Sequence, residues 1–244
     1  MKCTLAALGF INEDSIHNKN VIINTLKQYS GKADMVIFGE AFLQGFYGLN
    51  FQVVHDEKIA VSKDDVMIKE ICNAAKEYGM GVSFGFIEKE GDIFYSSQIT
   101  IASDGTILDV YRRVSPGWKE EFANEQYREG DGFHIFVYEG KTIAIGLCGD
   151  LWFDENVTAI KELNADVVFW PVYTDFNSEE WNKEIKHEYA EQAGGIGSKV
   201  LYVNSVCVDK EGEEIAKGGA ALFIGGKIEA EIPSGQEGVL MVEI

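Results

Sequence analysis

Short apolar segments alternate along this chain with amphipathic helical segments and turn signals, and this order constrains the fold more than any other feature. Strands are predicted at residues 1–10, 34–40, 81–87, 93–102, 107–111, 133–137, 142–147, 165–170, 200–208, 220–224, 227–230 and 239–242. Helices are predicted at residues 15–31, 62–79, 155–163 and 178–193. Because hairpins and helical crossovers both occur, we expect an α/β fold with two mixed sheets packed face to face and helices outside.

The second helix shows how element boundaries are predicted from single residues. Ser62, followed three residues later by Asp65, resembles a capping box and predicts a helix start near Ser62. Gly79 predicts the end of that helix. The polar and irregular residues 112–131 form a long connection instead, and connections of that length often carry function.

Length and composition support one domain that spans residues 1–244. The 244 residues are 46% hydrophobic and 12% aromatic, which is enough for a sizeable core. Forty acidic residues against 21 basic residues give a net charge of −19. Such a field repels nucleic acid and anionic membrane surfaces, so we expect the protein to bind neither.

The N-terminal segment and the cysteines predict a cytoplasmic protein. Residues 1–10 are too short for a membrane span and lack a signal-peptide cleavage pattern, so they are interpreted as a strand. The four cysteines show no Cys-x-x-Cys spacing and no nearby histidine. We therefore expect neither a metal site nor a disulfide framework.

Cys148 is the candidate nucleophile because an apolar strand leads directly into the tight turn Cys148-Gly149-Asp150. A thiol in such a turn can attack a substrate, and the backbone N–H groups of the turn can receive a developing oxyanion. A lone buried cysteine is usually a small hydrophobe, which is our interpretation of the other three. None of the four histidines has a context that suggests a base, so a carboxylate base is expected.

Glu40 is the candidate base, since it ends an apolar strand within Phe38-Gly39-Glu40-Ala41-Phe42. It is either a surface glutamate at a strand exit or a general base among apolar neighbours. Strand ends are where α/β folds gather their site residues. Residues 111–122 mix cations, carboxylates and an aromatic, and form either a solvated loop or a wall of the same site.

Taken in chain order, these segments resemble the carbon–nitrogen hydrolase (nitrilase) superfamily. Its glutamate, lysine and cysteine motifs are matched by Phe38-Gly39-Glu40, Tyr111-Arg112-Arg113 and Leu147-Cys148-Gly149-Asp150. A stretch that carries a second glutamate in the family is matched by Pro116-Gly117-Trp118-Lys119-Glu120. The resemblance covers essentially the whole chain.

The resemblance implies a four-layer α-β-β-α sandwich that associates as a homodimer or larger homo-oligomer. It also implies hydrolysis of a non-peptide carbon–nitrogen bond with no metal or other cofactor. Carried over, Glu40 takes the thiol proton, Cys148 attacks the amide carbon to form a thioester, and Glu40 then activates water. Glu120 would orient the site, and the Gly149 N–H would help to hold the oxyanion.

One position departs from the family pattern, because Arg113 occupies the place of the lysine. Arginine can stabilise negative charge but does not readily donate a proton. Three hypotheses follow. Arg113 serves as the oxyanion cation in a reshaped pocket, Lys119 supplies the missing ammonium, or the site has lost hydrolase activity.

The leading functional expectation is an amidase for a small amide or N-carbamoyl compound, with nitrilase activity less favoured. The aromatic residues Trp118, Trp152, Tyr173 and Phe176 follow the motifs and either line the substrate pocket or belong to the core. The alternative is a non-catalytic ligand-binding or regulatory protein that keeps the fold, which the arginine substitution leaves open. A metal-dependent phosphoesterase is disfavoured because an Asp/His ligand cluster is lacking.

Overall fold

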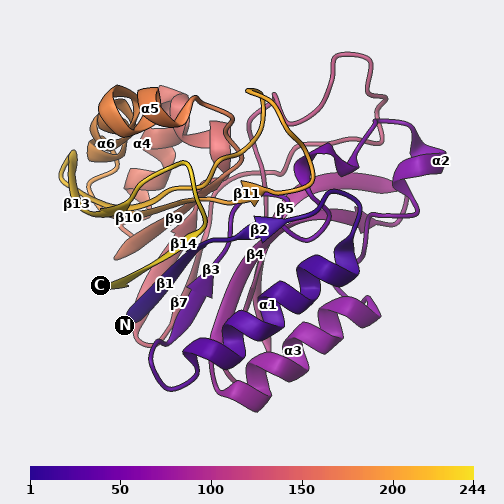
Figure 1. Ribbon diagram of the computed structural model, residues 1–244, viewed down its shortest axis with the longest axis horizontal. Helices are drawn as coiled ribbons and strands as arrows, with labels where there is room; N and C mark the ends of the chain where they lie inside the picture. Colours follow the sequence, from indigo (N-terminus) through magenta and orange to yellow (C-terminus); the bar gives the residue numbers. More distant parts are fainter.

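The computed structural model describes residues 1–244 and contains two six-stranded sheets and one small two-stranded sheet (Figure 1). The first sheet comprises β1 (Lys2–Ala7), β3 (Met35–Ile37), β4 (Gly81–Glu90), β5 (Ile93–Ile101), β6 (Ile107–Arg112) and β14 (Gly238–Glu243). The second comprises β7 (Ile135–Tyr138), β8 (Lys141–Ile145), β9 (Val167–Val172), β10 (Lys199–Asn204), β12 (Ala220–Ile224) and β13 (Lys227–Ile232). The small sheet pairs β2 (Gly9–Phe10) with β11 (Val206–Cys207).

Both large sheets are mixed and have the same arrangement of parallel and antiparallel strands. The strand orders are β14-β1-β3-β4-β5-β6 and β13-β12-β10-β9-β8-β7. In each sheet the three strands that helices connect are parallel, and the outer strands join through antiparallel pairs. Parallel neighbours need long crossovers, which is why helical segments separate these strands in the sequence.

Helices cover the outer face of each sheet. On the first sheet lie α1 (Ser15–Tyr29) and α3 (Val66–Tyr78), side by side. On the second lie α4 (Asp154–Glu162), α5 (Ser178–Glu180) and α6 (Lys186–Gly194), with a π-helical turn at Trp181–Ile185 between the last two. The short helix α2 (Val53–Asp56) and a 3₁₀ turn at Phe46–Gly48 precede α3 and were not predicted. The predicted four-layer α-β-β-α arrangement is confirmed.

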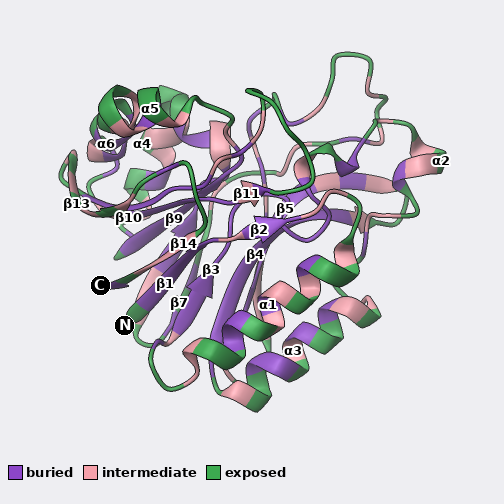
Figure 2. Cartoon of the chain, viewed as in Figure 1, coloured by how far each residue is buried: buried purple, intermediate pink, exposed green.

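Alternate residues of one strand serve two different cores. In β9, Val167 and Phe169 pack between the sheets, whereas Val168 and Trp170 pack under the helices of the second sheet. Figure 2 shows the central strands buried and the outward sides of α1 and α3 exposed. Strands buried on both faces have continuous apolar runs rather than alternating ones, as the sequence of β9 does.

The boundaries of α3 correct one expectation. This helix begins at Val66, not near Ser62, and Asp65 is its N-cap because the carboxylate accepts the Met67 N–H at 2.8 Å. Gly79 ends the helix as predicted, in the left-handed conformation with φ of 60°. None of the helices has the length and apolar composition that crossing a bilayer requires.

Candidate active site

Cys148 opens the 3₁₀ turn Cys148–Trp152 that follows β8. Its φ of 45° lies in the left-handed region, which costs free energy for a residue with a side chain. Two contacts hold it there. The Trp170 indole N–H donates to the Cys148 carbonyl at 2.8 Å, and the thiol donates to the Tyr173 carbonyl at 3.5 Å. The surrounding fold thus holds the strained backbone of Cys148 in place.

Asp150 ties the cysteine turn to the loop after β6. Its buried carboxylate accepts the Leu147 N–H at 2.9 Å and the Tyr111 hydroxyl at 2.6 Å on one oxygen. The other oxygen accepts the Ser115 N–H at 2.7 Å and the Val114 N–H at 3.2 Å. Burial raises the pKa of Asp150, although these hydrogen bonds act in the opposite direction. The carboxylate therefore fixes the loop that carries Arg113 beside the cysteine turn.

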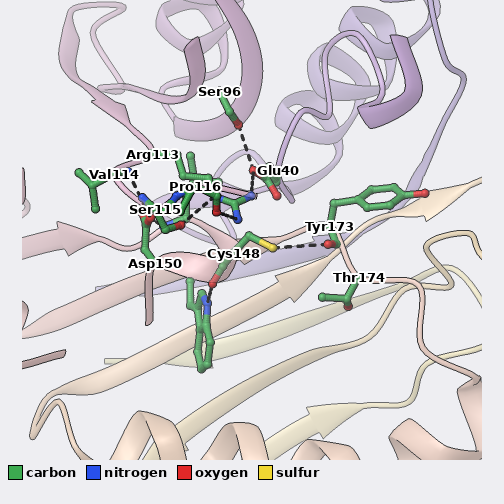
Figure 3. A network of polar contacts seen from close by, with 12 residues as sticks. Glu40, Ser96, Arg113, Val114, Ser115, Pro116, Cys148, Asp150, Tyr173 and Thr174 are labelled. Carbon is green, nitrogen blue, oxygen red and sulfur yellow. Dashed lines mark hydrogen bonds and ion pairs between the residues drawn. The ribbon is translucent and has the colours of Figure 1, made fainter. Parts of the chain in front are cut away.

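Glu40 and Arg113 form a buried ion pair next to the thiol (Figure 3). The Oε1 of Glu40 accepts from the Ser96 hydroxyl and from Arg113 Nη1, both at 3.0 Å. Its Oε2 is buried without a hydrogen-bond partner. Arg113 is also held by the Ser115 hydroxyl at 3.0 Å and the Pro116 carbonyl at 3.3 Å. One carboxylate oxygen is thus anchored, and the other has no hydrogen-bond partner.

Two glycines lie so close to Arg113 and to the backbone after Glu40 that neither position has room for a side chain. A Cβ on Gly149 would lie 2.5 Å from Arg113 Nη2, so any larger residue would displace the guanidinium from the cysteine turn. A Cβ on Gly85 of β4 would lie 2.2 Å from the Ala41 backbone nitrogen, directly after Glu40. Glycine at both positions lets backbone approach the charged pair.

The charges around Cys148 act in opposite directions on its thiol. Burial of the sulfur and the negative charge of Glu40 raise the pKa of Cys148 to about 12, and Arg113 partly opposes them. Glu40 in turn raises the pKa of Arg113 above its ordinary value, against the effect of burial. At neutral pH the resting thiol is therefore protonated, so an attack by the sulfur would require a base to remove its proton.

A second Glu–Ser–Arg cluster uses Ser97 and Arg112, the sequence neighbours of Ser96 and Arg113, with a glutamate from a different strand. Glu88 of β4 accepts from the Ser97 hydroxyl at 2.7 Å and from Arg112 at 2.7 and 2.8 Å. Because successive residues of a strand point to opposite faces, Arg112 and Arg113 serve different carboxylates. Only Arg113 reaches Glu40.

Lys119 and Glu120 lie outside the polar network of the thiol. The Lys119 ammonium contacts Glu129 at 2.8 Å and the Tyr127 carbonyl at 2.7 Å. Glu120 is exposed and forms neither a hydrogen bond nor an ion pair with Cys148, Glu40 or Arg113. The structure thus brings Arg113, and not Lys119, to the thiol.

A cleft of about 410 Å³ lies near the loop that carries Arg113, but neither Cys148 nor Glu40 nor Arg113 lines it. Its walls come from the segment before α2 and from the loop after β6, namely Phe46, Tyr47, Leu49, Asn50, Phe51, Gly117, Trp118, Lys119, Glu120 and Phe122. Of the predicted substrate-binding residues, Trp118 and Lys119 line the cleft, and Tyr173 borders it through its stacked contact with Phe46. Trp152 and Phe176 do not line it, since they pack against aromatic residues of the second sheet and its helices.

Sequence reasoning did not assign Ser96, Ser115 or Trp170 to the site. Ser96 belongs to the polar run Ser96-Ser97-Gln98 within β5, a strand that is mostly buried. A polar run in a buried strand was the signal that could have identified it, because buried polar groups require partners. No group of three or more His, Cys, Asp or Glu side chains is arranged to hold a metal ion.

We expect Asp150→Asn to lower the free energy of unfolding by about 2–5 kcal/mol. The carboxylate accepts four hydrogen bonds, and an amide would place its N–H₂ against two buried donors. Urea denaturation followed by tryptophan fluorescence measures the change. The exposed Asp154 provides the control, since Asp154→Asn should change the unfolding free energy by less than about 0.5 kcal/mol. Equal effects of the two substitutions would contradict this account.

The sequence of this chain matches a family model and several known proteins. Residues 12–244 match the model of the family described as Carbon-nitrogen hydrolase. Over 178 residues the chain is 29% identical to N-carbamoylputrescine amidase of Solanum tuberosum, covering 69% of this chain and 57% of that protein. Over 168 residues it is 26% identical to an (R)-stereoselective amidase of Pseudomonas sp, with coverage of 69% and 58%. The chain thus matches less than two thirds of the length of these relatives.

Among solved structures, an amidase from Nesterenkonia sp. superposes with a TM-score of 0.82 at 19% identity. The match covers 100% of this chain and 90% of that one. A glutamate-to-glutamine mutant of the amidase from Nesterenkonia sp. AN1, with a TM-score of 0.81, 18% identity and coverage of 100% and 93%, shows Michael addition of acrylamide at its active-site cysteine. At these identities the likeness establishes the fold.

Proposed function

This chain belongs to the carbon–nitrogen hydrolase family, and we propose that it is an amidase that hydrolyses a small amide or N-carbamoyl compound. The observation that carries the proposal is the placement of the Cys148 thiol beside the buried Glu40–Arg113 pair. A thiol, a carboxylate with one free oxygen and a fixed cation can supply the nucleophile, the base and the oxyanion charge for acyl transfer from an amide.

In the first step the free Oε2 of Glu40 takes the thiol proton as the sulfur of Cys148 attacks the amide carbon. Ser96 and Arg113 hold the other oxygen, so the carboxylate keeps its orientation during the transfer. The Arg113 charge and the Gly149 N–H stabilise the oxyanion. When the carbon–nitrogen bond breaks, the protonated Glu40 returns the proton to the departing amine, and a thioester remains on Cys148.

In the second step a water molecule gives its proton to Glu40 and attacks the thioester carbon. The carbon–sulfur bond then breaks, and the proton on Glu40 returns to the sulfur. The carboxylic acid leaves, and the resting thiol is restored. The raised pKa of Cys148 fits this cycle, because the thiol is regenerated in its neutral form.

The names of the relatives support the reaction class. Those from Solanum tuberosum and Pseudomonas sp are named as amidases, and the cysteine of the Nesterenkonia enzyme accepts a covalent adduct. A direct test combines ammonia release across panels of amides, N-carbamoyl compounds and nitriles with mass spectrometry of acid-quenched protein. The proposal requires turnover together with an acyl group on the Cys148 peptide. Ammonia release from none of these compounds would instead favour a ligand-binding protein that retains the fold.

A separate prediction concerns Arg113, which occupies the position where the family has a lysine. We expect Arg113→Ala to lower kcat by about 10²-fold and Arg113→Lys by about tenfold, because lysine retains the charge but not the planar contacts to Ser115 and Pro116. Steady-state kinetics measure both. Arg128→Ala, in the same loop but exposed, is the control with unchanged kcat. A larger loss for Lys119→Ala than for Arg113→Ala would identify Lys119 as the catalytic cation.

The family resemblance also leads us to propose that the chain works as a homodimer or larger homo-oligomer. Light scattering at several protein concentrations determines its molar mass in solution. A mass equal to that of one chain at all concentrations would refute this.

A further inference from the structure

We propose that Asn204, at the end of β10, is a positioning residue of the active site. Its side-chain amide holds the peptide unit between Tyr173 and Thr174, and the carbonyl of that unit accepts the hydrogen bond of the Cys148 thiol. The contribution of Asn204 to turnover rests on the proposed amidase function, whereas its effect on the thiol does not depend on any substrate.

The Asn204 amide binds both backbone groups of Thr174. Its Nδ2 donates to the Thr174 carbonyl at 2.8 Å and to the Thr174 hydroxyl at 3.1 Å, and its Oδ1 accepts the Thr174 N–H at 3.3 Å. Asn204 is the last residue of β10 and lies opposite Val172, the last residue of β9, in the parallel ladder. The side chain therefore continues the hydrogen bonding between the two strands beyond the point where their backbone pairing ends.

The Thr174 N–H and the Tyr173 carbonyl belong to one peptide unit. A trans peptide unit is planar, so its N–H and its C=O point in opposite directions. Because the N–H is turned toward Asn204, the carbonyl of the same unit points away from Asn204, and it accepts from the Cys148 thiol at 3.5 Å (Figure 3). Asn204 thus sets the direction of a group that contacts the nucleophile, although the amide itself forms no hydrogen bond with the sulfur.

Three successive backbone carbonyls join the base to the nucleophile and to Asn204. The Val172 carbonyl accepts the backbone N–H of Glu40 at 3.1 Å. The next carbonyl along the chain accepts from the Cys148 thiol, and the one after it accepts from Asn204. A displacement of this segment would change the distance between the thiol and the carboxylate, on which proton transfer between them depends.

Burial makes these contacts hard to replace. Asn204 is 3% exposed, so solvent does not compete for its partners, and the backbone groups of Thr174 lose theirs when the amide is removed. The Tyr173 ring is held separately, by its stacking on Phe46 and by the Ala216 N–H, which its hydroxyl accepts at 3.3 Å. Those contacts fix the side chain of Tyr173, whereas the Asn204 amide binds the peptide unit itself.

The test compares Asn204→Ala with a matched control, Asn182→Ala. The Asn182 amide also binds both backbone groups of a single residue, Ser234, at 2.9 Å each, and it forms no hydrogen bond with the thiol or with Glu40. Both substitutions should lower Tm by about 3–8 °C. Only Asn204→Ala should lower kcat, by about 10–100-fold with KM changed by less than about twofold, because it displaces the reacting groups and removes no substrate contact.

The infrared S–H stretch of Cys148 provides a measurement that needs no substrate. In each protein the band is assigned by subtracting the spectrum of the same protein with Cys148→Ala. We expect the band to move to higher frequency in Asn204→Ala, because the hydrogen bond to the Tyr173 carbonyl weakens, and to stay in place in Asn182→Ala. Asn204→Ser, whose shorter side chain cannot reach both backbone groups of Thr174, should show smaller changes in the same direction and replaces Asn204→Ala if that variant does not fold.

The two measurements separate this inference from the proposed function. An S–H band that stays in place in a folded Asn204 variant would overturn the inference, and so would an unchanged kcat or equal changes in Asn182→Ala. If the band moves as expected but the wild type hydrolyses no amide, the assignment of Asn204 stands and the amidase proposal fails. If amides are hydrolysed and neither the band nor kcat responds to the Asn204 substitutions, the amidase proposal stands and the assignment of Asn204 fails.

Discussion

Cys148→Ala is expected to lower the rate of amide hydrolysis by at least about 10⁴-fold, because removal of a nucleophile removes the covalent route as a whole. The side chain is partly buried, and its strained backbone is held by the Trp170 indole and by the Asp150 contacts within the turn. These contacts do not involve the sulfur, and the one hydrogen bond that the thiol donates, to the Tyr173 carbonyl, is long at 3.5 Å. The substitution should therefore change the free energy of unfolding by less than about 1 kcal/mol. Ammonia release and thermal denaturation on the same preparation measure both effects.

Cys72→Ala is the matched control. Cys72 is also a free, partly buried cysteine, but it lies on α3, on the outer face of the first sheet. Its replacement should leave turnover unchanged. A thioester mechanism would be refuted by a Cys148→Ala enzyme that keeps even a few per cent of wild-type activity in the absence of contaminating enzyme.

Glu40→Gln is expected to lower kcat by about 10²–10⁴-fold, the usual contribution of a general base. Glutamine has nearly the same shape, and its carbonyl oxygen can still accept from Ser96 and Arg113. At the same time the pKa of Cys148 should fall, because the carboxylate that raises it is gone while Arg113 remains. Iodoacetamide should therefore alkylate Cys148 faster in Glu40→Gln protein than in the wild type near neutral pH, although kcat of the variant is lower.

The direction of that pKa change follows from the charges. A lower thiol pKa means a larger thiolate fraction at every pH below it, and the thiolate is the form that iodoacetamide alkylates. Mass-spectrometric peptide mapping across pH gives the alkylation rate at each cysteine. A Glu40→Gln protein whose Cys148 reacts more slowly than in the wild type would contradict the assigned charge balance.

Glu88→Gln separates a catalytic effect from a structural one. Glu88 is also buried and paired with a serine and an arginine on the same strands, but its partners are Ser97 and Arg112. Loss of its charge should destabilise the fold without a comparable loss of kcat. Similar kinetic losses in Glu40→Gln and Glu88→Gln would show that the general-base assignment is wrong.

The layered fold could be predicted largely from the sequence because local patterns carry that information. The continuous apolar run of β9 predicts a strand buried on both faces, and Gly79 predicts the end of α3. The turn at Cys148 was also visible, because an apolar strand ends there in a Cys-Gly-Asp sequence. Conversely, the start of α3 was misplaced because Ser62 and Asp65 both have the chemistry of an N-cap, and local sequence did not separate them.

Contacts between distant segments could not be predicted in this way. Lys119 and Arg113 were both candidate cations, and the choice between them depended on Glu129 lying within reach of one and Glu40 within reach of the other. Ser96 faces Glu40 because of the register between β5 and the strands beside it, which sets the faces on which Ser96 and Ser97 point.

The sequence by itself therefore determined the main strands and helices, the buried faces and most of the residues able to perform chemistry. Only the tertiary structure decided which of those residues meet. Glu40 and Arg113 are 73 positions apart, and Asp150 lies 39 positions from Tyr111, so no local pattern encodes either contact. The aromatic cleft likewise joins residues 46–51 to residues 117–122. The physical reason is that backbone periodicity fixes the direction of a side chain along its own strand, whereas its partner depends on the packing of the whole chain.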